Sequence, residues 1–314
     1  MLVYLIKRLM VSIVVLIGIA FASFLIIHAV PGDPAKIQLG VHATPEAVAR
    51  LHHEWGLDKS WPAQFWLYLG NIVTFNFGTS TAFSSGVAEL IGNRIGPTVV
   101  LIVYGLLVAL VIGVPLAIVA AVRQGGVVDN AIRVLTTFTF AMPPFWLGLM
   151  LSLLLGFELK LFPVSGYESG ISGIFRTLTL PALTIGLGLL VIIVRNLRAN
   201  LVTALHSEYV EAARARGYGE TRVVFKHAMR NSIIGVITIL ASIFGFMIGI
   251  LVLIENVFQI PGAGTLLVQA VSKRDYQLVQ TLDFLSGAVV VVVGFLTDIA
   301  YAWLDPRLRL AGRS

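Results

Sequence analysis

The 314-residue chain contains no cysteine and few charged residues. Without a thiol it can form no disulfide, no thiolate metal site and no cysteine nucleophile. Asp, Glu, Lys and Arg together make up only 12% of the residues, whereas about 25% is usual in soluble domains. Hydrophobic residues make up 57%, and the mean hydropathy is +0.91. This balance predicts a polytopic membrane protein.

The sequence also lacks the motifs of common nucleotide-binding and hydrolytic sites. It contains no Gly-x-x-x-x-Gly-Lys-Ser/Thr, so it has no P-loop for nucleotide phosphates. It contains neither Gly-x-Ser-x-Gly nor His-Glu-x-x-His, the signatures of many hydrolases. The net charge of +6 is spread among short loops, which argues against nucleic acid as a partner. We therefore expect no catalytic residue in this chain.

Six apolar runs have the length of membrane helices, which need about 20 residues to cross a hydrocarbon core. The first run follows Lys7 and Arg8 like a signal peptide, but it is too long for cleavage to be expected. Lys and Arg favour the cytoplasmic side. With the N-terminus inside, 14 of the 22 basic residues lie on that side, so both termini are predicted to be cytoplasmic. The predicted spans of this all-α integral membrane protein are 9–30, 98–122, 134–157, 177–194, 233–254 and 284–304.

A large outer segment between the first two spans is mixed in character and is predicted to fold as a small cap. Pro45 follows Thr44 as at the start of a helix. His52, His53 and Glu54 suggest a metal site, but adjacent helical residues point in different directions, which favours solvated surface residues and no bound metal. The predicted organisation is an N-terminal segment with the first helix (1–30), an extracytoplasmic cap (31–97), a core bundle (98–304) with a cytoplasmic coupling loop (195–232), and a cytoplasmic tail (305–314).

Two features inside the predicted spans are candidates for a translocation path or gate. Met142, Pro143 and Pro144 interrupt the third span, because proline removes a backbone donor and clashes with the preceding turn. The break is either a packed kink or a bend that lines a pore. Gly245 and Gly249 in the fifth span form a small-xxx-small face that suits a helix bundle or a dimer seam.

One acidic residue, Asp298, lies within the last predicted span. A carboxylate in a membrane helix is costly and needs a partner or a water-filled cavity. We expect a structural partner such as Arg307, with a role in proton coupling as the alternative.

A short amphipathic helix is predicted in the cytoplasmic loop between the fourth and fifth spans. Acidic residues occupy its first turns and basic residues its last, as the helix dipole favours, and a glycine ends it. Its small alanines are expected to leave one face almost flat, so that the helix can dock on a cytoplasmic partner. The alternative is a solvated linker. The segment consists of Glu208, Tyr209, Val210, Glu211, Ala212, Ala213, Arg214, Ala215, Arg216 and Gly217.

These residues resemble the signature of the inner-membrane permease subunits of type I ABC importers. The family motif, Glu-Ala-Ala followed after three residues by Gly, stands here as Glu211-Ala212-Ala213 and Gly217. The following His227-Ala-Met229-Arg230-Asn231 is similar to the dipeptide and oligopeptide branch. Further matching segments are Pro31-Gly-Asp-Pro34, Gly56-Leu-Asp58, Phe162-Pro-Val-Ser-Gly166, Leu180-Pro-Ala-Leu183, Glu255-Asn-Val-Phe258, Pro261-Gly262, Arg274-Asp-Tyr276 and Leu304-Asp-Pro-Arg307.

The resemblance implies a six-helix permease with an extracytoplasmic cap in the inner membrane of a prokaryote. It implies a heterodimer with a second homologous permease, two cytoplasmic ATPases that bind ATP and Mg, and an extracytoplasmic solute-binding protein. The chain itself is expected to bind no cofactor. The cap departs from the family, since Phe75-Asn-Phe-Gly-Thr-Ser80 replaces the usual Gly-Asp-Leu-Gly-x-Ser.

The resemblance implies di- or oligopeptides as the substrate. It also implies that the segment from Glu208 to Arg216 is a coupling helix, which the ATPases pull when they close on ATP. Related systems carry nickel, haem or other small solutes, so these are the alternatives. A secondary transporter or channel driven by an ion gradient is a distant alternative, and so is an intramembrane enzyme. Transport by the purified chain in proteoliposomes without ATP would favour the secondary transporter.

Overall fold

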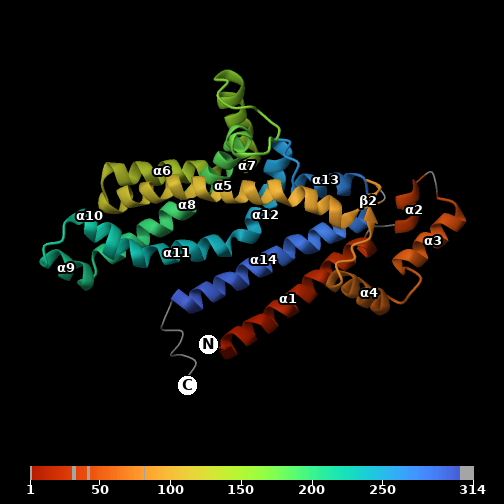
Figure 1. Ribbon diagram of the computed structural model, residues 1–314. Coiled ribbons are helices and arrows are strands. Elements are labelled where there is room, and N and C mark those ends of the chain that lie inside the picture. The colour runs from red at the N-terminus through yellow and green to blue at the C-terminus, as the bar shows by residue number, and fades with distance from the viewer. Residues whose placement is uncertain (1, 30–32, 41–42, 81, 305–314) are drawn as a thin grey trace. The chain divides into compact units, whose positions relative to one another are not determined.

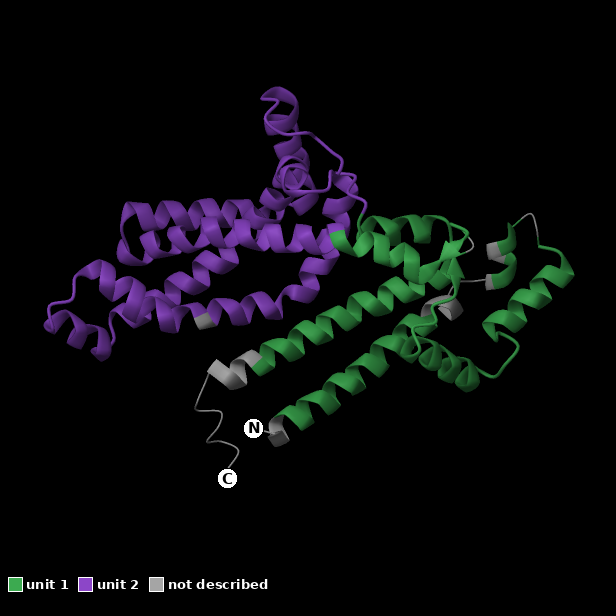
Figure 2. Cartoon of the chain, in the orientation of Figure 1, with its two compact units in different colours: residues 1–96, 262–314 green, residues 97–261 purple. Residues whose placement is uncertain are grey.

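The computed structural model describes residues 2–29, 33–40, 43–80 and 82–304. Helices make up nearly all of this part of the chain, which confirms the predicted all-α class (Figure 1). The chain divides into two compact units, coloured separately in Figure 2. Unit 1 consists of Met1–Gly96 with Gly262–Ser314, and unit 2 of Pro97–Pro261. The predicted organisation by role, with one core bundle over 98–304, stays a prediction.

Unit 1 is built on two long helices, α1 and α14, that lie side by side and run in opposite directions (Figure 1). Short helices and a two-stranded antiparallel hairpin follow α1 along the chain. The elements of this unit are α1 (Leu2–Ala29), α2 (Pro34–Leu39), α3 (Pro45–Trp55), α4 (Trp61–Val73), β1 (Thr79–Ser80), β2 (Ser85–Gly86), the first turns of α5 (Val87–Val122), α13 (Ala263–Ser272) and α14 (Tyr276–Leu304).

Polar side chains join α1 to α14. Arg8 forms an ion pair with Asp298, and the Ser23 hydroxyl donates a hydrogen bond of 2.6 Å to Asp283. The predicted structural partner of Asp298 is thus confirmed, and the neighbouring helix supplies it as Arg8; Arg307, which was named as an example, lies outside the described residues. Pairing between adjacent helices lowers the cost of charges in an apolar environment.

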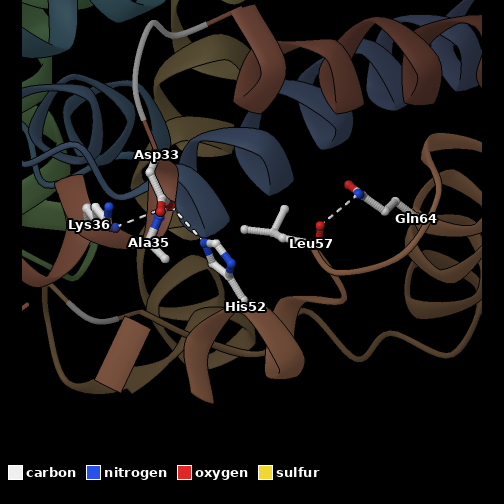
Figure 3. Close-up of polar contacts among 6 residues, drawn as sticks. All are labelled: Asp33, Ala35, Lys36, His52, Leu57 and Gln64. Carbon is white, nitrogen blue, oxygen red and sulfur yellow. Dashed lines mark hydrogen bonds and ion pairs between the residues drawn. The ribbon is translucent and has the colours of Figure 1, made fainter. Parts of the chain in front are cut away.

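Three short helices of the cap begin with proline in their first turn, where its missing N–H is not needed. Asp33 caps α2 by accepting a hydrogen bond from the Ala35 amide, and its carboxylate also lies 2.8 Å from His52 Nε2 (Figure 3). Burial opposes ionisation of Asp33, but the hydrogen bonds from His52 and Ala35 outweigh it and hold its pKa below the usual value. His53 is exposed, as predicted. No group of three metal-ligating side chains occurs in the described part of the chain.

Asp275 fastens the hairpin to the start of α14. Its carboxylate accepts hydrogen bonds from the Ser80 hydroxyl, the Ala82 amide and the Leu278 amide, and its side chain is buried. The Gln277 amide adds a hydrogen bond of 2.9 Å to the Phe77 carbonyl. One carboxylate thus caps a helix and orders a loop almost 200 residues away in the sequence.

Unit 2 is a helical bundle around the long helix α8. Fully buried side chains such as Leu180, Ile193 and Leu197 place α8 at the centre of its hydrophobic core. The elements are the rest of α5, α6 (Val127–Ala141), α7 (Pro144–Leu151), the π-helix η2 (Ser152–Glu158), α8 (Ile171–Leu205), α9 (Glu208–Ala215), α10 (Glu220–Arg222), the π-helix η3 (Val223–Ala228), α11 (Met229–Ser242) and α12 (Phe244–Val257).

Glycines allow α5 and α8 to approach closely. A Cβ on Gly105 of α5 would lie 2.8 Å from Ile185, and one on Gly186 of α8 would lie 2.6 Å from Val108. Both distances are too short for carbon atoms in contact, so any side chain at either position would push the helices apart. Small residues at such crossings are typical of helix packing in membranes.

Five helices have the length and composition of membrane spans, and a sixth counts if α6 and the α7–η2 segment form one broken span. These two segments meet at 102°, which confirms the predicted interruption of the third span (134–157) at Met142, Pro143 and Pro144. The two prolines after Met142 explain the sharp break, since they end one helix and begin the next. The fifth candidate span, Glu220–Ser242, also lies earlier than the predicted 233–254, because the helix is interrupted at Ile243.

An ion pair between Asp129 and Arg198 ties α6 to α8. The Asp129 side chain is fully buried and faces the guanidinium in a bidentate arrangement, with Nε–Oδ1 at 2.6 Å and Nη2–Oδ2 at 2.5 Å. The Gly125 amide donates a further hydrogen bond of 2.9 Å to the same carboxylate. Every oxygen of the buried group therefore has a partner, as a buried charge requires.

We expect Asp129→Ala to lower the free energy of unfolding by about 3 kcal/mol, because it leaves the Arg198 guanidinium largely buried without a counter-charge. Denaturant unfolding in detergent micelles measures the loss. Adding Arg198→Met should restore much of it. Asp58→Asn, at an exposed carboxylate, is the matched control and should leave the free energy of unfolding nearly unchanged. Equal losses for Asp129→Ala and Asp58→Asn would contradict a stabilising role for the buried pair.

Candidate functional site

The predicted coupling loop forms an elbow at one end of unit 2, defined here as residues 206–222 (Figure 1). Helix α8 ends at Leu205, and only two residues separate it from α9 (Glu208–Ala215). After Gly217 the chain enters α10 and continues through η3 into α11. The elbow is thus bounded on both sides by helices long enough to cross a membrane.

Helix α9 ends in the way predicted from Gly217. The Tyr218 amide donates to the Ala213 carbonyl and the Gly217 amide to the Arg214 carbonyl, which is the hydrogen-bond pattern of a Schellman motif. Gly217 has φ +82°, a conformation that a β-branched residue strongly disfavours. A Cβ there would meet no atom within 4 Å, so the requirement for glycine comes from the backbone alone.

One face of α9 is buried against its own unit. Val210 and Ala213 are packed in the core of unit 2 with Val223 and Val224 of η3. The predicted flat face of three alanines was therefore wrong, because consecutive helical positions point in different directions and Ala213 faces inward. The outward face carries Glu208, Tyr209, Glu211, Ala212 and Ala215.

Arg214 holds the elbow together. Its guanidinium pairs with both oxygens of Glu220, at 2.8 and 3.2 Å, and donates a hydrogen bond of 3.1 Å to the Leu205 carbonyl at the end of α8. These hydrogen bonds to Glu220 raise the pKa of Arg214. Arg214 thus joins α8, α9 and α10, and its predicted role in contacting an ATPase stays a prediction. Arg216, by contrast, is exposed and forms no side-chain bond to a described residue.

Aromatic side chains pack on the inner side of the elbow. Tyr218 stacks on His227 with ring centroids 5.5 Å apart, and the Arg222 guanidinium lies 4.5 Å above the Tyr218 ring. Neither Glu208 nor Glu211 forms an ion pair with a described residue. The elbow therefore presents the Glu208 and Glu211 carboxylates and the Arg216 guanidinium outward, whereas the Tyr209 hydroxyl accepts a hydrogen bond of 3.4 Å from Asn231.

The break between α6 and α7 borders a cavity of about 130 Å³ in unit 2. Met142 and Pro144 line it, together with Thr184 and Gly188 of α8 and Phe246 of α12. The lining is almost entirely apolar. The other predicted path residues, Pro143, Gly245 and Gly249, do not line this cavity. Gly249 is exposed, and a Cβ there would meet no atom within 4 Å.

Comparison with known proteins decides the family. Residues 1–93 match the N-terminal component of binding-protein-dependent transport membrane proteins, and residues 113–310 match the binding-protein-dependent transport system inner membrane component. The chain belongs to this family. It is a multi-pass inner-membrane permease subunit of an ABC transporter, a transport component that works in a complex with ATPases and a binding protein.

Similar permeases match over almost their full length. A putative peptide permease of Brucella suis is 36% identical, over 99% of this chain and 100% of the relative. A probable peptide ABC transporter permease of Sinorhizobium fredii is 33% identical, over 98% and 99%. The glutathione transport system permease of Pectobacterium atrosepticum is 35% identical, over the same shares. The family assignment favours a non-enzymatic subunit of an ABC transporter over a gradient-driven carrier or an intramembrane enzyme.

Two buried acidic residues of the permease were not singled out from the sequence. Glu255 is fully buried and accepts a hydrogen bond of 2.6 Å from Thr98, and Asp129 is paired with Arg198. Glu255 lies at the end of an apolar run, and the hydrophobic pattern there fits a solvated carboxylate as well as a buried one. The only available signal for Asp129 was its place in the first turn of a helix after Gly125-Gly126, which favours an acid but names no partner.

We expect Arg214→Gln to increase amide hydrogen exchange throughout α9, because it removes the bonds to Glu220 and Leu205. The effect on global stability should stay below about 1 kcal/mol, since the pair is largely exposed. Hydrogen exchange read by mass spectrometry separates the local effect from the global one. Arg216→Gln, two residues away, removes the same charge without these bonds and should leave exchange unchanged. The same exchange in both variants would show that Arg214 does not hold the elbow.

Proposed function

We propose that this permease imports di- or oligopeptides. Two of its relatives are described as peptide permeases and a third as a glutathione permease, and glutathione is itself a tripeptide. In the proposed complex, the chain pairs with a second homologous permease and two ATPases that bind ATP and Mg. An extracytoplasmic binding protein delivers the peptide. Both chain termini and the elbow face the cytoplasm, in agreement with the distribution of Lys and Arg.

The coupling step in this proposal rests on one observation: α9 is anchored on its inner face and chemically open on its outer face. Val210 and Ala213 are buried, and Arg214 is bonded to the helices on either side. Glu208 and Glu211 remain available to basic or hydrogen-bond donor groups of an ATPase. A coupling helix needs both properties, because it must contact the ATPase on one face and transmit the force to the permease through the other.

Helix α8 connects the elbow to the cavity. It runs without interruption from Ile171 to Leu205, and Thr184, Gly188 and Ile192 on it line the cavity. At 1.5 Å per residue, Ile192 is about 20 Å from the elbow end of the helix. A displacement of α9 by closing ATPases therefore moves the cavity wall, and a rigid-body tilt of α8 exchanges outward for inward access. Met142 and Pro144 stand opposite as part of the proposed path.

We expect Gly217→Val to uncouple ATP hydrolysis from transport, because valine cannot adopt the φ of +82° without rearranging the end of α9. The strain is about 1–2 kcal/mol, which is enough to displace α9 without unfolding the helical bundle of unit 2. Peptide uptake and stimulated ATPase activity of the reconstituted complex measure the effect. Uptake should fall by more than about tenfold while assembly persists.

Gly219→Val provides the matched control for this substitution. Gly219 lies two residues further on, has φ −66°, and a Cβ there would meet no atom within 4 Å. Valine should be tolerated at this position. Glu211→Lys, on the exposed face, should reduce uptake without changing stability. Full uptake and normal ATPase stimulation in both Gly217→Val and Glu211→Lys would refute the coupling role.

The peptide substrate is tested by uptake in proteoliposomes that contain the complete transporter and its binding protein. We expect unlabelled di- and tripeptides to compete with a labelled peptide, and ATP to be required for accumulation. Nickel and haem serve as the matched alternatives in the same assay. ATP-dependent accumulation of nickel or haem without any competition by peptides would overturn the peptide assignment and leave the permease assignment intact.

A further inference from the structure

Unit 1 contains a cavity of its own, and its lining shares no residue with the cavity of unit 2. This cavity, here called the cap pocket, has a volume of about 240 Å³ and is enclosed by α3, α4, the segment before β1, and the start of α14. Its lining is rich in carboxamide and hydroxyl groups, which come from Gln64, Tyr68, Asn71, Asn76, Gln277 and Gln280. An apolar membrane subunit has no structural need for so many polar groups around one hollow.

One carboxamide of the cap pocket is buried without an internal partner. Gln280 is only 5% exposed, and its carboxamide forms no hydrogen bond with a described residue. The Tyr68 hydroxyl, by contrast, is buried beside Ser23 and Asp283, the pair that joins α1 to α14. Burial, with a contribution from Asp283, raises the pKa of Tyr68, although hydrogen bonding with Ser23 opposes the rise. Unused buried donors and acceptors are costly unless a ligand or water satisfies them.

Other carboxamides of the pocket are held in place by the backbone. The Gln64 amide donates to the Leu57 and Lys59 carbonyls at 3.3 and 2.8 Å, and one of these bonds is visible in Figure 3. The Gln277 amide donates to the Phe77 carbonyl. These bonds fix the wall of the pocket around Gln280. Preorganised polar groups are typical of ligand sites.

The charge of the pocket defines the ligand further. Among the described residues that line it, Glu54 is the only charged one, and no Lys or Arg is present. A ligand carboxylate would be desolvated there without a cation, whereas an ammonium group would meet Glu54. A carboxamide offers a donor and an acceptor, as a peptide bond does. Trp55 and Leu67 supply an apolar part of the wall.

We propose that the cap pocket binds the amino-terminal end of an extended peptide. Glu54 pairs with the ammonium group, Gln280 bonds the first peptide unit, and Trp55 and Leu67 contact a side chain. The volume lies below the roughly 300–1,000 Å³ of sites that hold a whole drug-sized ligand. The pocket therefore holds one or two residues and leaves the rest of the peptide outside. This inference rests on the proposed peptide substrate and adds a binding site for it outside the translocation path.

The ligand chemistry is tested with the assembled transporter in nanodiscs, without its binding protein. Equilibrium dialysis compares trialanine, trialanine amide and N-acetyl-trialanine. We expect trialanine and its amide to bind with similar affinity, because the carboxylate end does not enter the pocket. Acetylation should weaken binding by about tenfold or more, because it removes the charge that Glu54 recognises.

Substitutions locate the site. Gln280→Leu should weaken trialanine binding by about tenfold. Gln269→Leu, at an exposed glutamine of α13, is the matched control and should have no effect. Glu54→Gln should weaken trialanine binding as much as acetylation does, and acetylation should then cost nothing more. Glu46→Gln, on the same helix α3 and also exposed, should preserve the difference between the two peptides.

Three results would overturn the cap pocket as a peptide site. These are no trialanine binding to the complex, equal binding of acetylated and free peptide, or binding that Glu54→Gln and Gln280→Leu leave unchanged. Because Glu54 is exposed, Glu54→Gln tests the site even if Gln280→Leu prevents folding. Peptide uptake by the complete transporter together with any of these results would leave the proposed function standing. Loss of peptide uptake in the wild type, with nickel or haem carried instead, would contradict the proposed function itself.

Discussion

The anchoring of α9 to its neighbouring helices is the constraint on which the proposed transport depends. A helix of eight residues is too short to be stable alone in water. Its order comes from the burial of Val210 and Ala213, from the bonds of Arg214, and from the turn at Gly217. Helix α9 therefore cannot move without moving the end of α8, to which Arg214 binds it. Coupling requires such a mechanical connection.

The core of unit 2 extends this constraint toward the cavity. Close contact of α5 and α8 at Gly105 and Gly186 leaves no slack between the two helices, and the pair Asp129–Arg198 joins α6 to the same α8. Interiors packed at this density move as bodies rather than deform locally. The sharp break at α6–α7 supplies the one irregular wall of the cavity, where the packing of long helices is interrupted.

Sequence reasoning located the elbow well but assigned its residues incorrectly in part. It placed the end of α9 and the special backbone of Gly217 correctly, because caps and left-handed turns depend on a few adjacent residues. The sequence pattern placed three alanines on one docking face, which the structure does not show. It placed Arg214 in the last turn of α9 correctly but did not identify the groups that Arg214 binds. Burial of Ala213 and the bonds of Arg214 depend on η3, α10 and the end of α8, which no local pattern identifies.

The sequence by itself determined the membrane class, the family motif and the helix ends at proline and glycine, since hydropathy and backbone conformation are properties of short segments. Only the tertiary structure decided that Asp298 pairs with Arg8, that Asp129 pairs with Arg198, and that the chain bends by 102° after Met142. The same holds for the cap pocket, whose polar groups come from positions 54–79 and 277–280. Such partners are chosen by three-dimensional packing, because burial makes each charge depend on whichever group the fold brings within reach.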